Sequence, residues 1–248
     1  MKASLPMYMR PELIDDHNVY WSLINQNLTQ LAITSATELE HPSDLGAFCL
    51  DKNLLLTQTC GMPYRNSLHG KVQLVGTPDF KVYGCEPGYY RSAIVVRAEE
   101  GDKALSSFKD GVLAFNSTTS QSGYSAAYWH CKAHGFWFDK TLTSGGHQAS
   151  AMAVAEGKAD IAAIDAVTWR LLCSYEPFTS QLTALDWTEP TPGLPYITSN
   201  NHDPNKIFQA ISAAIDALPE QTKERLGIHS LIRFTAEDYL SVKNPDID

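Results

Sequence analysis

A polar loop at residues 116–123 restricts the fold of this chain more than any other segment. The apolar run Val112–Phe115, typical of a buried strand, leads into it, and the helical run Ser125–His134 follows it. A strand that ends in a loop and continues as a helix leaves backbone N–H groups without partners at the helix start. The helix dipole adds partial positive charge there, so the loop suits an anion. The alternative is an ordinary N-cap, because Ser and Thr are preferred capping residues.

The rest of the chain alternates predicted strands and helices, which indicates an α/β fold. Further strands are expected at residues 3–7, 54–57, 72–75, 90–97, 140–143, 160–164 and 182–185. Further helices are expected at residues 17–31, 44–50, 147–156, 165–175, 204–218 and 236–242. In the first of these, Asp15 or Asp16 is the expected cap, and Val19 belongs to the expected apolar face. Irregular loops are expected at residues 76–88 and 188–195, which are interrupted by Gly and Pro.

Polar residues follow several of these strands, where open α/β sheets bind their ligands. The polar segments are residues 8–10, 58–61, 116–122 and 144–147, together with Asp165. Their Ser, Thr, Asn, Tyr and His side chains can hydrogen-bond a ligand, and no nucleophile–base pair is evident. We therefore expect these segments to form a binding site.

Composition excludes several classes of protein. The chain has 248 residues, of which 44% are hydrophobic and 19% charged, as in a globular protein of one or two domains. The net charge of −9 and the lack of a Lys/Arg cluster argue against nucleic acid as a partner. No apolar run approaches the roughly 18 residues of a membrane span, and the first residues lack the apolar core of a signal peptide. The expected location is the cytoplasm, or the periplasm if a signal was removed before residue 1.

Residues Ser144–Ser150 and Val154–Asp165 resemble the second lobe of the phosphate/phosphonate-binding proteins of ABC transporters. Ser120–Gly123 looks like the Ser-x-Ser-Gly anion loop of that family. Residues Glu189–Pro195 resemble its return crossover, and Asp238-Tyr239 in the last helix fit its tail. The resemblance covers nearly the whole chain through the order and spacing of these motifs.

The resemblance implies a type II periplasmic-binding fold, with two α/β lobes, each a mixed sheet flanked by helices, and a ligand cleft between them. Lobe one is expected at residues 1–90 and 193–248, and lobe two at residues 91–192. The implied function is a solute-binding protein that clamps a small phosphonate- or phosphate-like oxyanion, or a zwitterion, for an ABC transporter. It implies permease subunits as partners and a monomer, without cofactor, metal or catalytic residues.

The resemblance also implies the ligand-binding residues. Ser120 and Ser122, with the backbone at Gln121 and Gly123, hold oxyanion oxygens, and His147 donates to the same group. Asp165 accepts from a protonated oxygen or an amine. Tyr8 and Tyr90 match aromatic cleft positions, Gln58 and Thr59 are donors at a strand end, and Asn116 opens the polar loop.

Simpler roles remain open for several of these residues. His147 can merely start a helix, Asp165 can be only the N-cap of the next helix, and Tyr90 can pack in a core or hinge. Trp169 is expected in the core and Arg91 on the surface. Two other functions also remain open, namely a cytoplasmic ligand sensor and a small-molecule enzyme on the same fold.

The five cysteines show no spacing typical of a metal site. In the enzyme alternative, Cys60 is the nucleophile and His69 or His147 the base. Cys60 and Cys85 are either two buried thiols or a disulfide, which would close a loop of about 25 residues and stabilise the fold by about 3 kcal/mol. A disulfide would indicate an oxidising compartment.

Overall fold

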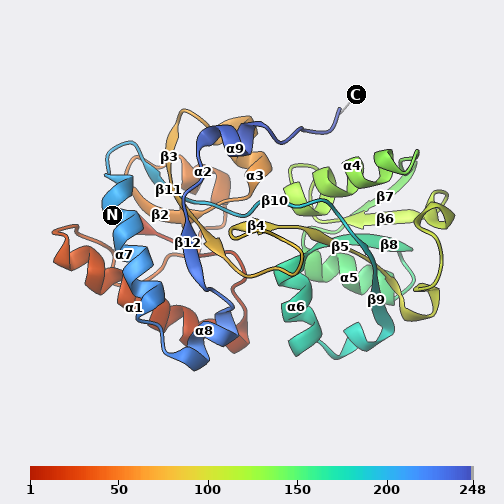
Figure 1. Cartoon of the computed structure of the whole chain (residues 1–248), viewed down its shortest axis with the longest axis horizontal. Helices are drawn as coiled ribbons and strands as arrows, with labels where there is room; N and C mark the ends of the chain where they lie inside the picture. The colour runs from red at the N-terminus through yellow and green to blue at the C-terminus, as the bar shows by residue number, and fades with distance from the viewer. Residues whose placement is uncertain (247–248) are drawn as a thin grey trace. The chain divides into compact units, whose positions relative to one another are not determined.

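The computed structural model describes residues 1–246, and the chain forms two compact units. Unit 1 contains Met1–Tyr89 and Pro192–Val242, and unit 2 contains Tyr90–Thr191 together with the tail from Lys243 onward. This tail was expected in lobe one, and residues 247 and 248 of that range lie outside the described residues. In each unit a mixed sheet is flanked by helices, as expected for the α/β fold (Figure 1).

Unit 1 is built on a five-stranded mixed sheet in the order β1-β2-β11-β3-β12. Its strands are β1 (Lys2–Ala3), β2 (Leu54–Gln58), β3 (Val72–Asp79), β11 (Tyr196–Ser199) and β12 (Ser230–Ile232). β1 and β2 run parallel, whereas β11 runs antiparallel to both β2 and β3. Because β11 follows the return of the chain and pairs with two earlier strands, the two segments of unit 1 share one sheet.

Six α-helices belong to unit 1: α1 (Ile14–Gln30), α2 (Leu45–Cys49), α3 (Gly61–Pro63), α7 (Pro204–Asp216), α8 (Glu220–Leu226) and α9 (Ala236–Leu240). The start and the buried face of α7 follow most directly from its sequence. Asp203 caps its first turn, and Ile207, Ile211 and Ile215, four residues apart, are fully buried on one face.

Several predicted boundaries in unit 1 were wrong. α1 begins at Ile14 because a 3-10 turn that starts at Pro11 runs directly into it, so Asp15 and Asp16 lie in its first turn and do not cap it. Val19 is exposed. β1 ends at Ala3, β3 continues to Asp79 through the predicted loop, and α8, β11 and β12 were missed. The two missed strands have four residues or fewer, too short for a periodic pattern to show.

Unit 2 contains a second five-stranded sheet in the order β7-β6-β8-β5-β9. Its strands are β5 (Ser92–Arg97), β6 (Val112–Phe115), β7 (Lys140–Thr143), β8 (Ile161–Asp165) and β9 (Leu182–Trp187). β6, β7 and β8 are parallel, and β5 is antiparallel to β8 and β9. The helices are α4 (Ala126–Ala133), α5 (His147–Ala155) and α6 (Ala166–Tyr175). All eight of these elements were predicted, within a few residues at each end.

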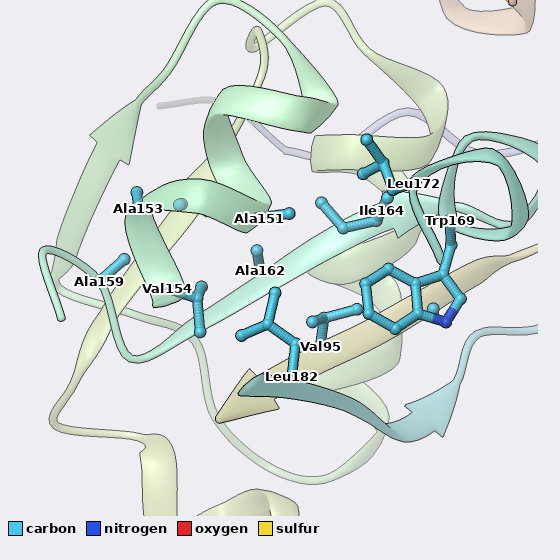
Figure 2. Packing of buried hydrophobic residues seen from close by; sticks show 12 residues of the cluster. Val95, Ala151, Ala153, Val154, Ala159, Ala162, Ile164, Trp169, Leu172 and Leu182 are labelled. Carbon is cyan, nitrogen blue, oxygen red and sulfur yellow. The ribbon is translucent and has the colours of Figure 1, made fainter. Parts of the chain in front are cut away.

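The central strand β8 is buried on both faces. Ala162 and Ile164 pack with Ala151 of α5 and with Trp169 and Leu172 of α6, and Figure 2 shows this cluster. Ile161 and Ala163 point to the opposite face and pack with Ala127 and Cys131 of α4. Burial on both faces holds β8 firmly, so Asp165 at its end has a well-determined position. Trp169 is a core residue, as expected.

The chain passes between the units at β4 (Tyr89–Tyr90) and β10 (Thr191–Pro192), which form a two-stranded sheet. The prediction that residues 188–195 contain no regular structure was therefore wrong at β10. Gly193 follows this strand and donates its N–H to the Gly88 carbonyl at 2.8 Å. A Cβ at Gly193 would lie 2.9 Å from that oxygen, so the position requires glycine.

Two further expectations concern cysteines and membranes. All five cysteines are present as thiols, and Cys60 and Cys85 are half-buried. Of the two alternatives for this pair, the structure therefore contains the thiols. Within residues 1–246, every helix is too short or too polar to cross a lipid bilayer.

Candidate functional site

Polar residues gather at one edge of the sheet in unit 2. Phe115 pairs with Thr143, and Ala114 pairs with Ala162, so the parallel strands β6, β7 and β8 end at the same edge. The loop after β6, the loop after β7 and Asp165 therefore lie there together. β5 is antiparallel and begins at this edge, where Ser92 is opposite Asp165. This arrangement unites seven predicted site residues: Asn116, Ser120, Gln121, Ser122, Gly123, His147 and Asp165.

The loop after β6 leads into a π-helical turn, η5 (Gln121–Ser125), and then into α4. The Ser125 N–H donates to the Ser120 carbonyl, five residues earlier, at 3.0 Å. The Ser120 hydroxyl accepts from the Gly123 N–H at 3.0 Å, so Ser120 is an N-cap. Within residues 1–246, the N–H of Ser122 donates to no acceptor, as expected for the first turn of a helix.

Ser122 and Gly123 contact residues of the loop after β6, the start of α5 and the start of β5. The Ser122 hydroxyl lies 2.9 Å from Nε2 of His147, and the Ser122 carbonyl accepts from the Ser92 hydroxyl at 2.9 Å. A Cβ at Gly123 would lie 2.0 Å from Oδ1 of Asn116 and 3.3 Å from Cε1 of His147. Only glycine therefore fits between these two side chains.

Two buried polar atoms beside this turn lack hydrogen-bond partners among the described residues. They are Oδ1 of Asn116 and Nδ1 of His147. Leaving a buried polar atom unsatisfied costs about 1–3 kcal/mol, so such atoms are uncommon in native proteins and call for an explanation. A bound polar ligand would supply the missing partners.

His147 is neutral at physiological pH. Burial lowers the pKa of its ring to about 4, and the backbone of Ala163 opposes this shift only in part. A neutral imidazole donates from one nitrogen and accepts at the other. His147 therefore contributes directed hydrogen bonds and no positive charge. As the first residue of α5 it also has the simpler role of a helix start.

Asp165 is buried and caps α6. Its Oδ1 accepts from the N–H groups of Val167 and Thr168 at 2.8 and 2.9 Å. The N-cap role anticipated as the simpler alternative is therefore present. The position at the same sheet edge as Ser122 is compatible with the predicted ligand contact as well.

Arg91 and Ser92 were not among the predicted site residues. The Arg91 guanidinium lies 4.8 Å from the centre of the Trp187 ring, and both residues lie at the polar edge of the sheet. Arg91 was expected on the surface and is half-buried. Ser92 is buried and joins β5 to the π-helical turn η5 through Ser122. The sequence signal that could have identified them is their position just before the β-branched residues Ile94–Val96 of β5.

The remaining predicted site residues are Tyr90, Tyr8, Gln58 and Thr59. Tyr90 is buried in β4. In unit 1, Tyr8 and Gln58 line a cavity of about 10 Å³, which is room for about one water molecule. Gln58 donates to the Leu194 carbonyl at 3.0 Å. The N–H of Thr59 donates to the Pro195 carbonyl at 3.0 Å, so its backbone takes part in the packing of unit 1.

Tyr8 has an unusual backbone, with φ of 64°, and its ring meets Phe80 edge-on at 5.0 Å between centroids. A bulky residue with positive φ is uncommon and marks a position that its surroundings hold in place. The same cavity is lined by Tyr20 and Tyr196, whose hydroxyl oxygens lie 3.4 Å apart. Unit 1 therefore has its own small polar cluster around Tyr8 and Gln58.

Comparison with solved structures shows the same fold in several binding proteins. PhnD1 from Prochlorococcus marinus, solved with methylphosphonate, has a TM-score of 0.74 and 17% identity, covering 98% of this chain and 95% of that one. A binding protein component of an ABC phosphonate transporter from Pseudomonas aeruginosa has a TM-score of 0.72 and 14% identity, covering 98% and 83%. A protein from Xanthomonas citri, solved with ATP, has a TM-score of 0.69 and 14% identity, covering 96% and 92%.

Sequence comparison is more specific about the family. No curated protein sequence matches the chain. The family model described as "ABC transporter, phosphonate, periplasmic substrate-binding protein" matches residues 68–239, which is more than half of the chain. This range contains the turn at residues 120–123, His147 and Asp165. The chain therefore belongs to the phosphonate substrate-binding proteins of ABC transporters, and it is a solute-binding protein.

Proposed function

We propose that the chain binds a small phosphonate- or phosphate-like anion at the polar edge of unit 2, against the turn formed by Ser120–Gly123. We infer that units 1 and 2 correspond to the two lobes expected from the sequence. The observation that carries the proposal is the juxtaposition of an unused donor, the Ser122 N–H, with an unsatisfied buried acceptor, Asn116 Oδ1.

The mixture of donors and acceptors favours a protonated oxyanion. The Ser122 N–H and the start of α4 attract negative charge. Asn116 Oδ1 accepts hydrogen bonds, and an oxyanion that retains a hydroxyl proton can donate to it. A singly protonated phosphonate or phosphate has both features, whereas sulfate and small carboxylates at neutral pH are acceptors only. We therefore propose that the site prefers the former.

We propose binding without chemistry. The Ser122–His147 pair has the spacing of a nucleophile and its base. An effective base, however, has a pKa near the operating pH, and the His147 ring has a pKa of about 4. Among the described residues, no carboxylate accepts from Nδ1 of His147 to orient the ring. The pair therefore suits ligand binding better than acyl or phosphoryl transfer.

We further propose that the protein works in the periplasm and delivers its ligand to an ABC permease. The description of the family supports both points. Cell fractionation with an antibody against the native protein tests the location. Copurification of permease subunits from solubilised membranes in the presence of ligand tests the partner. Recovery of the protein only in the cytoplasmic fraction would favour the sensor alternative.

Calorimetry on the purified protein tests the ligand class. The panel contains methylphosphonate, 2-aminoethylphosphonate, phosphate, sulfate and small carboxylates. Gly123→Ala places a methyl group where Asn116 Oδ1 now lies and should abolish binding of the best ligand. Thr118→Val, which removes an exposed hydroxyl from the same loop, should bind as the wild type does. Equal affinity of Gly123→Ala and the wild type would place the site elsewhere.

A further inference from the structure

A second cluster of ligating side chains lies in unit 2, apart from the residues assigned to the anion site. His130 and His134 come from the end of α4, and Asp186 comes from β9. One potential ligand atom from each residue lies within 4.8 Å of the others, the only such set among the described residues. No metal site was predicted from the sequence, although the two histidines have i, i+4 spacing.

His130 already contacts Asp186, and the His134 ring lies beside the His130 ring. Nε2 of His130 lies 3.0 Å from Oδ2 of Asp186, and the His130 and His134 rings are 4.9 Å apart between centroids. Nδ1 of His134 donates to the His130 carbonyl at 2.9 Å. This bond places the proton of a neutral His134 ring on Nδ1 and leaves a lone pair on Nε2. Metal-ligating histidines are commonly held by such a bond from their second nitrogen.

We propose that His130, His134 and Asp186 bind a divalent transition metal ion, with zinc as the best fit. Imidazole and carboxylate are ligands that zinc accepts, and tetrahedral donors about 2.0–2.2 Å from zinc lie about 3.3–3.6 Å apart. The ligand atoms lie within 4.8 Å of one another, so the separations need to shorten by at most about 1.5 Å, which a small shift of the exposed His134 side chain can supply. Water completes the coordination.

Charge around the cluster favours a cation. His130 and His134 lie at the carboxyl end of α4, where the helix dipole is negative. Glu189 adds a second carboxylate that acts on His130. For the ion to bind Nε2 of His130, the single proton of the neutral ring moves from Nε2 to Nδ1, and the ion takes the place of that proton between Nε2 and Asp186 Oδ2. The ion would link α4, which directly follows the turn η5, to the edge strand β9.

The simpler reading is that His134 caps the helix end and His130 forms a hydrogen bond with Asp186. That interpretation explains each of the two hydrogen bonds when it is considered separately. It does not account for the convergence of three ligand atoms from two elements, or for the unshared lone pair that the His134 tautomer directs away from the helix end. The two readings differ in their response to added metal, which makes them experimentally separable.

Titration of metal-free protein with zinc chloride tests the proposal, after removal of any histidine tag and dialysis against EDTA. Calorimetry should show one site in the wild type. His134→Ala and Asp186→Asn should each weaken zinc binding at least about tenfold, the scale that even outer partners of metal ligands reach. His41→Ala, an exposed histidine in unit 1, should bind zinc as the wild type does. His134 is exposed, so its replacement should leave the fold intact by circular dichroism.

Cobalt gives a second readout that reports coordination directly. The wild-type cobalt complex should show the visible absorption of a low-coordinate site, and both ligand variants should lose it while His41→Ala keeps it. The proposal is overturned if the wild type fails to bind zinc at millimolar concentration. It is equally overturned if His134→Ala and Asp186→Asn bind zinc as tightly as the wild type. Neither result bears on the anion site, because these residues take no part in it.

Discussion

The hydroxyl of Ser122 lies 2.9 Å from Nε2 of His147 and joins the turn after β6 to the first residue of α5. The two residues are 25 positions apart in the sequence and meet because β6 and β7 are parallel neighbours that end at the same edge. The contact fixes both side chains next to the Ser122 N–H. The proposed anion site is built around this pair.

Replacement of Ser122 by alanine tests its hydroxyl. Hydrogen bonds to charged groups contribute about 1.5–3 kcal/mol, which corresponds to a loss of roughly 10- to 150-fold in affinity for the best phosphonate. Calorimetry measures the change, with Thr118→Val as the matched control from the same loop. If Ser122→Ala binds within twofold of the wild type, the hydroxyl serves only to hold His147.

Ser120→Ala should act on stability through the helix start. The Ser120 hydroxyl accepts from the Gly123 N–H, and loss of an N-cap typically costs about 1 kcal/mol. Urea denaturation should show that decrease in the free energy of unfolding, whereas Thr118→Val should leave it unchanged. Unaltered stability of Ser120→Ala would mean that another group satisfies the Gly123 N–H.

The free energy of unfolding should depend on pH because the buried His147 ring has a lowered pKa. Its folded pKa of about 4 is below the unfolded value of about 6.5, so the unfolded state binds more protons between these values. The contribution is fully present above about pH 6.5 and is lost as the pH falls towards 4, by up to about 3 kcal/mol. Unfolding measured from pH 7 to 4 should be less acid-sensitive in His147→Gln. Identical profiles for the two proteins would show that the ring is protonated normally.

Asp165→Asn separates the capping role of Asp165 from a role in recognition. Asn is also a good N-cap, so α6 should persist. If Asp165 accepts from an amine of the ligand, the variant should lose affinity for 2-aminoethylphosphonate and keep its affinity for methylphosphonate. Calorimetry with the two ligands gives the comparison. An equal loss of affinity for both ligands would mean that Asp165 supports the structure of the site and does not contact the amine.

Local signals in the sequence predicted much of unit 2. The run Val112–Phe115 is apolar and ends in a polar loop, and Asp165 directly precedes an amphipathic helix, so a strand–turn–helix and a capped helix followed from neighbouring residues alone. The same holds for α7, where Asp203 and Pro204 mark the start. These predictions were confirmed because the deciding interactions are short-range.

Features that depend on pairing between distant strands could not be predicted. Ser92 meets Ser122 and Asp165 only because β5 runs antiparallel to β8, and no pattern within β5 specifies that partner. β11 follows a proline-rich segment and is defined by its partners β2 and β3. The start of α1 was missed because Pro11 begins a preceding 3-10 turn that merges with the helix.

The amide proton of Ser122 tests the central claim most directly. In ¹H–¹⁵N spectra recorded during titration with methylphosphonate, its resonance should shift strongly downfield and saturate at the calorimetric affinity. The amide of Gly111, which already donates to the Phe108 carbonyl at 2.8 Å just before β6 begins at the opposite edge of the sheet, should hardly move. A Ser122 resonance that shifts no more than that of Gly111 at saturating ligand would contradict the account.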